Sequence, residues 1–550
     1  MRSKVMLVVV IVSLVITAWD GKPASAGELL YNGIELPDEW PPNYGWSRQP
    51  MPVPYLESPP EVINIDVGRQ LFVDDFLIEE TTLKRTFHQA TYYKDNPIWP
   101  SSACRGGIWY DPYDKLFKMW YGTSCAYATS TDGIHWEKPS LDVVPGTNIV
   151  FPFKTGLPSH ARDNLRYKVD YSTVWIDYST KPTQWRYKIF YTPSAMDDPT
   201  RVGDDLSLAY KCSADGIHWS EQPVAISGVT GDLTLAFYNP FRDKWACNIR
   251  SGGETSGGEP TGRARAYVEA DTAAEAVRLA HVPIAGKVVA WLWADGSDPK
   301  PPGDVIVDAP HRAHYRPDLH HVNPVAYESL MLGYFTICHS WLGKAMEVGL
   351  GYSRDGFHYD RPDRRHIFKA FEKEKPGEWR SFKRVQSVTG ACLVVGDKLF
   401  LYFVGDGSTG LAFLRRDGFA SMGSTTDEGQ LLTRPLRFSG KYLFVNTDCD
   451  QGELRVEVLD KNGEVVEPFT TDNCVPVIVD KTLQRVEWKG AKDLSALSGE
   501  PVRFRFHLRL GEVYSFWVSP DESGASHGYV GAGGPGYTSF VDTVGEGAYR

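Results

Sequence analysis

A seven-residue pattern that occurs three times constrains the fold of this chain more than any other feature. It places Ser, Asp, Gly, His and an aromatic residue at fixed positions in residues 130–136 (STDGIHW), 213–219 (SADGIHW) and 353–359 (SRDGFHY). Weaker copies surround Asp271 and Asp417, so the aspartate recurs at intervals of 56 to 84 residues. Each strong copy follows two β-rich runs, and repeated units of this size are typical of propellers and related arrays. We therefore predict an all-β chain with a five-bladed β-propeller that closes on itself.

The expected strands support this count. They are apolar, β-branched or aromatic runs that end at turn residues, and they lie at 107–110, 116–121 and 126–130 in the first blade, 172–176, 185–191 and 207–212 in the second, 233–237, 244–249 and 264–269 in the third, 322–326, 331–337 and 348–352 in the fourth, and 388–395, 399–404 and 410–414 in the fifth. The strand-like run 70–78 is expected to supply a fourth strand to the fifth blade, which would hide an open sheet edge. The propeller would then span residues 63–426. Shorter, evenly spaced strands follow and predict a C-terminal β-sandwich over 427–522.

The two ends of the chain differ from these domains. Arg2 and Lys4 precede an apolar run and small residues at 24–26, which is typical of a secretory signal peptide over 1–26. We therefore expect a secreted or periplasmic protein with no membrane segment after cleavage. Residues 27–62, rich in Pro and Trp, are expected to form an extended surface arm, and the Gly-rich tail 523–550 is expected to be irregular.

Composition narrows the classes of partner. The net charge is −11 and no stripe of Lys or Arg occurs, so nucleic acid is not expected to bind. The 17 Trp residues are expected to serve mainly in blade packing, with a few rings free to stack on sugars. Eight Cys residues leave open a disulfide between Cys104 and Cys125 and another between Cys449 and Cys474.

Propeller geometry predicts where chemistry lies. If the first strand of each blade is innermost and starts at the open face, its first residues surround the mouth of the channel. Counting back from the hairpins brings Asp170, Asp232 and Asp318 to this mouth. Glycosidic cleavage needs one carboxyl to donate a proton and another to attack or to activate water. We assign Asp232 and Asp318 as this pair and Asp170 as a residue that orients substrate. Purely structural roles stay open, because Asp232 and Asp318 could cap turns and Asp170 could pair with a neighbouring cation.

Further residues are expected to bind substrate at the same mouth. Adjacent residues of a strand point to opposite faces, so at most one of His320 and His321 should line the channel, as a substrate donor or as a ligand for a central cation near His321. Glu328 falls in a hairpin at the other end and is not expected to act. No cofactor is required, although a structural Ca²⁺ is left open. The candidate substrate-binding residues are Arg105, Arg250, His320, His321, His339, Trp341, Arg384, Gln386 and Asp406.

These features together resemble the five-bladed propeller glycosidases related to glycoside hydrolase families 32 and 43, followed by a C-terminal sandwich. The resemblance covers about residues 63–518 and rests on the repeats, on 109–112 (WYDP), on 118–121 (KMWY) and on the blade count. It implies three acids on the inner strands of the first three blades: a nucleophile or base, an orienting Asp and an acid Glu. Asp170 and Asp232 match two of these positions. The first blade has 101–105 (SSACR) instead of an acid, and the third blade has Asp instead of Glu.

The leading hypothesis is thus a secreted glycoside hydrolase acting on a polysaccharide or oligosaccharide. One alternative is a carbohydrate-binding propeller without catalysis, which the missing acid of the first blade favours. A second alternative is a polysaccharide lyase acting on acidic glycans, for which His320 or His321 would be the base and Arg105 and Arg384 would bind the anionic group.

Overall fold

The computed structural model describes residues 27–103, 106–122, 125–151, 172–178, 185–192, 206–299, 316–339, 345–368, 384–424 and 428–549. Nearly all its regular elements are strands, which confirms the all-β prediction. The few helical segments are α1 (Pro54–Glu57), α3 (Ala273–Leu279), η3 (Ser495–Leu497) and η4 (Gly545–Tyr549). Within the described residues, no helix is long and apolar enough to cross a membrane.

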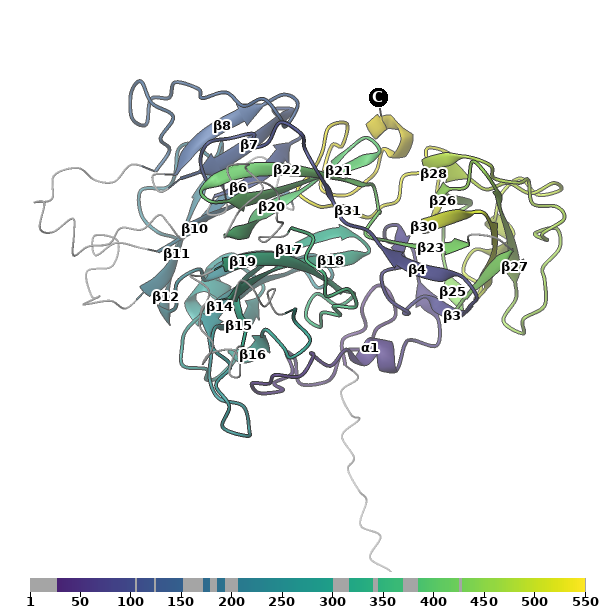
Figure 1. Cartoon of the computed structure of the whole chain (residues 1–550), viewed down its shortest axis with the longest axis horizontal. Coiled ribbons are helices and arrows are strands. Elements are labelled where there is room, and N and C mark those ends of the chain that lie inside the picture. Colours follow the sequence, from purple (N-terminus) through teal and green to yellow (C-terminus); the bar gives the residue numbers. More distant parts are fainter. Residues whose placement is uncertain are drawn as a thin grey trace, which may run out of the picture.

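Most described strands between residues 91 and 415 group, in chain order, into antiparallel units of the propeller (Figure 1). The units contain β6 (Gly107–Asp111), β7 (Leu116–Tyr121) and β8 (Ala126–Ser130); β9 (Thr173–Ile176), β10 (Tyr187–Tyr191), β11 (Leu206–Ser213) and β12 (Ala225–Thr230); β13 (Leu235–Asn239), β14 (Lys244–Ser251), β15 (Ala264–Ala270) and β16 (Val289–Leu292); β17 (Asp318–Glu328), β18 (Leu330–His339) and β19 (Ala345–Ser353); and β20 (Val385–Val395), β21 (Lys398–Gly405), β22 (Ser408–Arg415) and β5 (Thr91–Tyr92).

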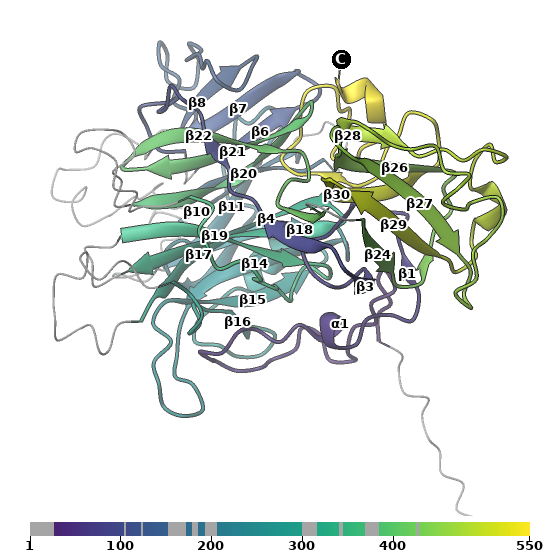
Figure 2. The ribbon, with the colours of Figure 1, turned by 45° about the vertical axis from the view of Figure 1, so that its right-hand side comes forward.

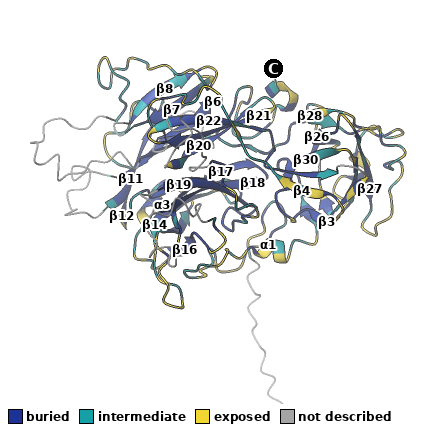
Figure 3. Cartoon of the chain, viewed as in Figure 1, coloured by how far each residue is buried: buried dark blue, intermediate teal, exposed yellow. Residues whose placement is uncertain are grey.

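The first strand of each unit lies at the common centre, as expected. Strand β6 contacts β9 and β20, β9 contacts β13, and β17 contacts both β13 and β20, so these inner strands form a closed ring. A single parallel pair, Gly390 with Ile108, joins β20 to β6. Figure 3 shows the central strands as almost entirely buried. The ring therefore has two distinct ends: one where the inner strands begin and one where their hairpins turn.

The predicted role of the run 70–78 is wrong. The fourth strand beside β22 is β5, whereas β2 (Gln70–Leu71) pairs with β30 (Gly511–Ser519) of the C-terminal domain. The side chain of Phe72 is fully buried and packs against Phe506 and Phe516 of that domain. The early strands therefore belong to the sandwich, and the propeller strands begin near residue 91 rather than at residue 63.

The C-terminal domain is a β-sandwich of two described sheets beside the propeller (Figure 2). One sheet contains β28 (Asp480–Arg485), β26 (Tyr442–Asp448), β30, β23 (Ala420–Ser424), β4 (Lys84–Phe87) and β2; the other contains β27 (Glu453–Leu459), β29 (Arg503–Arg509), β24 (Gly429–Thr433) and β3 (Ile78–Thr81). A short parallel pair joins β1 (Ile63–Asn64) to β25 (Leu436–Arg437). Cys449 and Cys474 are buried free thiols, so the disulfide left open between them is not formed.

The three strong repeats form the same hydrogen-bonded turn. In each copy the aspartate Oδ1 accepts the backbone N–H groups two and three residues later, at 2.8 Å, and its Oδ2 contacts the histidine Nδ1 at 2.6–2.7 Å. The third copy is buried, and its His358 Nε2 is 2.9 Å from the Tyr44 hydroxyl of the N-terminal arm. The repeats thus build turns between strands, and the arm covers one of them.

Most of the Gly-rich tail is irregular, as predicted, but it contains β31 (Tyr529–Val530) and η4 and it docks on the propeller. Strand β31 pairs with β17, and the following residues cross the hairpin end of the ring. Backbone hydrogen bonds connect this segment to β17, β20 and β6: Gly531 N–H to Ala326 O (3.0 Å), Ala532 N–H to Cys392 O (2.8 Å), Tyr110 N–H to Ala532 O (2.9 Å) and Val394 N–H to Gly533 O (3.0 Å). The tail therefore covers the centre of the ring at its hairpin end.

A buried ionic network holds the sandwich against the same end. Arg69 Nη1 donates to Asp417 Oδ2 at 3.0 Å, and Arg416 Nη2 donates to Glu328 Oε1 at 3.1 Å. All four side chains are fully buried, and the Arg69 guanidinium also lies 4.0 Å from the centre of the Trp517 ring. Glu328 therefore has a structural role away from the mouth, as the sequence predicted.

Candidate functional site at the start of the inner strands

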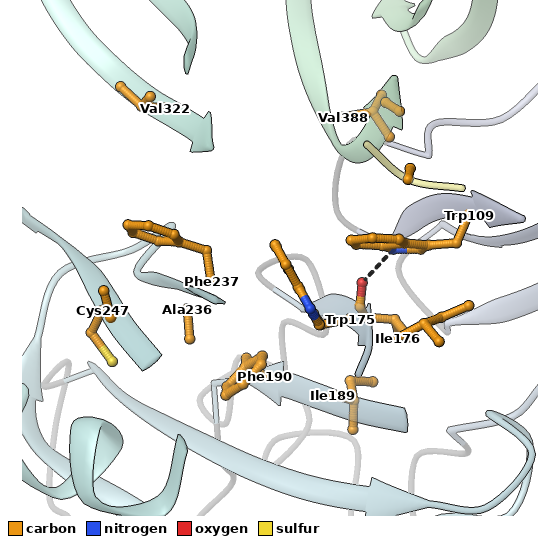
Figure 4. Packing of buried hydrophobic residues seen from close by; sticks show 14 of the residues in the cluster. Trp109, Trp175, Ile176, Ile189, Phe190, Ala236, Phe237, Cys247, Val322 and Val388 are labelled. Atoms are coloured by element: carbon orange, nitrogen blue, oxygen red, sulfur yellow. Dashed lines mark hydrogen bonds between the residues drawn. The ribbon is translucent and has the colours of Figure 1, made fainter. Parts of the chain in front are cut away.

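The candidate site lies at the end of the ring that the tail leaves uncovered. Below it, aromatic side chains fill the centre of the ring. Trp109 and Trp175 pack edge to face with their ring centres 4.8 Å apart, and Trp109 Nε1 donates to Val174 O at 2.9 Å. Figure 4 shows these rings near Phe237, with Val322 and Val388 on the neighbouring inner strands. Because all of these side chains are buried, the polar residues at the strand starts lie above an apolar floor.

His320 and His321 lie at an irregularity in β17. The pairing of β17 with β18 shifts between Leu319 and His321, which marks a β-bulge. A bulge breaks the alternation of side chains along a strand, so both imidazoles turn toward each other, with 2.9 Å between their Nδ1 atoms. The expectation that at most one of them lines the channel assumed a regular strand, and it stays a prediction.

His321 belongs to a buried hydrogen-bond network that joins three strands. Its Nε2 lies 3.1 Å from Ser387 Oγ on β20 and 3.2 Å from Thr336 Oγ1 on β18. Asn323 Nδ2 donates to the same Ser387 Oγ at 2.9 Å. These contacts fix the orientation of the His321 ring and give it hydroxyl partners through which a proton could move.

Asp232 lies in the loop before β13, on the same rim. Its Oδ1 is 2.8 Å from Arg250 Nε, and its side chain is 20 % exposed. The turn itself is closed by Thr234, whose hydroxyl donates to Gly231 O at 2.9 Å and accepts the Arg250 N–H at 3.2 Å. The alternative role of Asp232 as a turn cap is therefore filled by Thr234, and the carboxylate faces an arginine.

Asp318, at the start of β17, is half-buried and contacts the start of β15. Its Oδ1 accepts the Arg263 backbone N–H at 3.1 Å. Gly262 passes so close that a Cβ there would lie 2.0 Å from this oxygen, and its φ of +66° also favours glycine. Asp318 is thus held at the boundary between the third and fourth blades.

Arg265 joins β15 to β17 by a hydrogen bond and was missed by the sequence analysis. It is fully buried, and its Nη1 donates to His320 O at 3.2 Å while Nε donates to Asn248 Oδ1 at 2.5 Å. Asp232 interacts with it electrostatically. Because Arg265 and Arg263 are two residues apart at the start of β15, Asp232 and Asp318 lie on either side of this strand start.

His339 is buried beside a carboxylate that the sequence analysis did not single out. Glu347 Oε2 on β19 lies 3.3 Å from His339 Nε2 and 3.0 Å from His366 Nε2. Burial opposes ionisation of Glu347, but hydrogen bonds from these two imidazoles outweigh it and lower the pKa of the carboxyl to about 2. No sequence signal marked Glu347 or His366, because they come from an outer strand and from the segment after a repeat.

The candidates of the fifth blade are at the same end. Arg384 and Asp406 are exposed, and the Asp406 backbone N–H donates to Arg384 O at 3.3 Å. Gln386 is half-buried, and its Oε1 is buried without a hydrogen-bond partner among the described residues. Asp170, Arg105 and Trp341 lie outside the described residues, so their assigned roles stay predictions.

Metal binding finds no support in the described part of the chain. No group of three or more His, Cys, Asp or Glu side chains there is arranged to hold a metal ion. Around His321 the described partners are another imidazole, hydroxyls and backbone oxygen. The cation considered near His321, and a structural Ca²⁺ elsewhere, therefore stay untested predictions.

No protein-family model matches this chain, and neither does any curated protein. Solved structures with a similar arrangement include the GH43 protein BlXynB from Bacillus licheniformis, with 10 % identity over 79 % of this chain and 100 % of that chain and a TM-score of 0.35. The endo-1,5-α-L-arabinanase from Thermotoga petrophila is 10 % identical over 78 % of this chain and 100 % of that chain, with a TM-score of 0.30. The GH32 β-fructofuranosidase from Bombyx mori is 11 % identical over 79 % and 94 %, with a TM-score of 0.28. Likenesses at this level carry no argument about the activity or substrate of this chain.

Proposed function

We propose that this chain is an exported glycoside hydrolase that cleaves glycosidic bonds in a polysaccharide or oligosaccharide where the inner strands of its propeller begin. One observation carries the proposal. Two carboxylates from successive blades, Asp232 and Asp318, lie on either side of the start of β15, at the end of the ring that the tail leaves uncovered. Paired carboxyl groups at an open rim are what glycosidic cleavage requires.

The environments of the two carboxyl groups suggest their roles. In this proposal Asp232, whose Oδ1 lies 2.8 Å from Arg250 Nε, is the base or nucleophile. Asp318 then supplies the proton to the leaving oxygen. Asp170 orients the sugar, and Arg105, Arg384, Gln386, Asp406, His339 and Trp341 contact its hydroxyl groups or ring, as assigned from the sequence.

A polysaccharide lyase is the second candidate, and the His320–His321 pair favours it. A neutral imidazole can remove the proton beside a uronic acid carboxylate, and the nearby arginines would stabilise the resulting charge. A lyase eliminates the leaving sugar without adding water. The two candidates therefore differ in the mass of their products.

The test is to incubate the mature chain with a panel of neutral and acidic polysaccharides and to analyse the products by mass spectrometry. Products that have gained water support the hydrolase, whereas unsaturated products identify a lyase. If binding occurs without any product, the chain is a carbohydrate-binding propeller and the proposal fails.

Asp232→Asn is expected to lower the rate by about 10²–10⁴-fold, as loss of a catalytic acid or base does. Its apparent melting temperature should change little, because the side chain is partly exposed and does not close the turn. Asp243→Asn is the matched control: it lies in the β13–β14 hairpin of the same blade, at the opposite end of the ring. Full activity in Asp232→Asn would remove this residue from the mechanism.

A further inference from the structure

Three arginines gather at the rim beside Asp232. Arg250 on β14 and Arg265 on β15 are direct cross-strand partners, and Arg263 lies two residues before Arg265. Like charges directly opposite each other in a sheet are destabilising. We call Arg250, Arg263 and Arg265 the arginine cluster. A fold retains such a cluster at low cost only when negative charge balances it.

Arg265 is the most deeply buried member of the arginine cluster and has no solvent contact. Its described hydrogen bonds go to neutral oxygens: Asn248 Oδ1, Leu233 O, Asn248 O and His320 O. Burial, together with the positive charges of Arg250 and Arg263, lowers the pKa of this guanidinium to about 9, although the Asp232 carboxylate acts in the opposite direction. A buried cation bonded only to neutral groups is costly, so a negative charge placed beside it would be bound favourably.

Within the part of the chain that the structure describes, the three arginines of the cluster have two carboxylates nearby, Asp232 and Asp318. Among the described residues, Asp232 ion-pairs with Arg250 alone. Asp318 accepts the Arg263 backbone N–H. The Asp318 carboxylate also attracts Arg48, and the positive charge of Arg316 repels Arg48. No described carboxylate lies within ion-pair distance of the Arg263 side chain. This local excess of positive charge stands against a whole-chain net charge of −11.

We propose that the arginine cluster binds an anionic group, a carboxylate or a sulfate, on an acidic glycan. This inference rests on the proposed function for its location, since the cluster flanks Asp232 and Asp318, and it deepens that function by naming the substrate class. Guanidinium groups present paired N–H donors that match the oxygens of carboxylates and sulfates. The anion would bind between Arg250 and Arg263, the two half-buried members, while buried Arg265 adds its field.

The experiment measures binding of three oligosaccharide sets by isothermal titration calorimetry at low ionic strength. The sets are oligogalacturonates, the same oligomers after reduction of their carboxyl groups, and sulfated galactan oligomers. The carboxylate set, the sulfate set or both should bind about tenfold or more tightly than the neutral set, and added salt should reduce this ratio. Which anionic set binds decides between carboxylate and sulfate.

Variants test whether the cluster produces the preference. Arg250→Gln and Arg263→Gln should each reduce the ratio of anionic to neutral binding by about tenfold. Lys244→Gln is the matched control, because Lys244 lies at the opposite end of the same strand, where it pairs with exposed Asp271. The ratio of anionic to neutral binding distinguishes a loss of anion recognition from a general loss of glycan binding. If one of the two variants misfolds, the other still tests the proposal.

The outcomes distinguish this inference from the proposed function. Hydrolysis of neutral glycans without any preference for acidic ones would overturn the inference and leave the glycosidase intact. Preferential binding of acidic glycans without cleavage would support the inference and overturn the glycosidase. The inference is also overturned if Lys244→Gln reduces the ratio as much as the cluster variants do, or if neither acidic nor neutral glycans bind.

Discussion

Replacing Gly534 by alanine is expected to detach the C-terminal tail from the hairpin end of the propeller. A Cβ at this position would lie 1.8 Å from Val394 O, a distance that no van der Waals contact permits. The chain must therefore move away from β20. This movement breaks the hydrogen bond from Val394 N–H to Gly533 O and strains the bond from Tyr110 N–H to Ala532 O.

The magnitude follows from these two bonds. A buried backbone group left without a partner costs about 1–3 kcal/mol, so the substitution should destabilise the tail by about 2–4 kcal/mol after partial relaxation. Because a protein with two domains need not unfold in one step, the appropriate assay is local. Hydrogen exchange followed by mass spectrometry should show faster exchange in peptides covering 524–549 and 385–395.

Gly547→Ala is the control within the same tail. Its nearest neighbour would be Val544 Cβ at 3.7 Å, an ordinary contact, so exchange should stay as in the parent protein. If the tail of Gly534→Ala exchanges hydrogen as slowly as that of Gly547→Ala, the close contact at Gly534 does not hold the tail against β20 and β6.

Two further predictions concern buried carboxylates. Asp111 is fully buried and accepts hydrogen bonds from Lys118 at 2.8 Å and from Arg186. Asp111→Asn leaves buried Arg186 without a described carboxylate partner, while Lys118 keeps Asp114, and it should cost about 3–5 kcal/mol, seen as a lower apparent melting temperature. A shift no larger than that of an exposed substitution would contradict this. The pKa of Glu347 is lowered from 4.5 to about 2, so its stabilising effect is complete above about pH 4.5 and is lost as the pH falls toward 2. The stability difference between the parent and Glu347→Gln, measured by thermal melting from pH 6 to pH 3, should therefore shrink with acidification; a difference that stays constant would refute the assignment.

The repeats could be predicted from the sequence because their hydrogen bonds are local. The Asp132 carboxylate accepts N–H groups from residues 134 and 135, and Asp215 and Asp355 do the same in their own copies. A pattern seven residues long therefore contains the whole turn. The all-β class and the central position of each blade's first strand follow from these turns and the runs before them.

Partners that are distant in the sequence could not be predicted. Gln70 and Leu71 pair with residues 515 and 516, and nothing in an apolar run specifies which of two β domains it joins. Most of the tail is irregular, as predicted, but its docking against the ring could not be predicted. Gly531, Gly533 and Gly534 are required there by the close approach of β6 and β20.

The candidate site was partly accessible from the sequence. Counting back along the inner strands brought Asp232, Asp318 and the His320–His321 pair to one rim, because these residues depend only on where each blade begins. Arg265 and Glu347 were missed because they lie on outer strands, whose side chains reach the rim only through the packing between blades. The bulge at residues 319–321 was also missed, since a bulge leaves no mark on the pattern of apolar residues.

The two ends of the ring differ in how their buried arginines are paired, and this difference supports the proposed anion site. At the hairpin end, Arg69 and Arg416 each have a buried carboxylate as partner, in Asp417 and Glu328. Each of these two cations therefore has its counter-ion within the protein. At the opposite end Arg265 is equally buried, yet its described hydrogen bonds go only to neutral oxygens. The Asp232 carboxylate acts on Arg265 electrostatically but makes no described hydrogen bond to it, so an anionic ligand would add at this end the contact that Asp417 and Glu328 provide at the other.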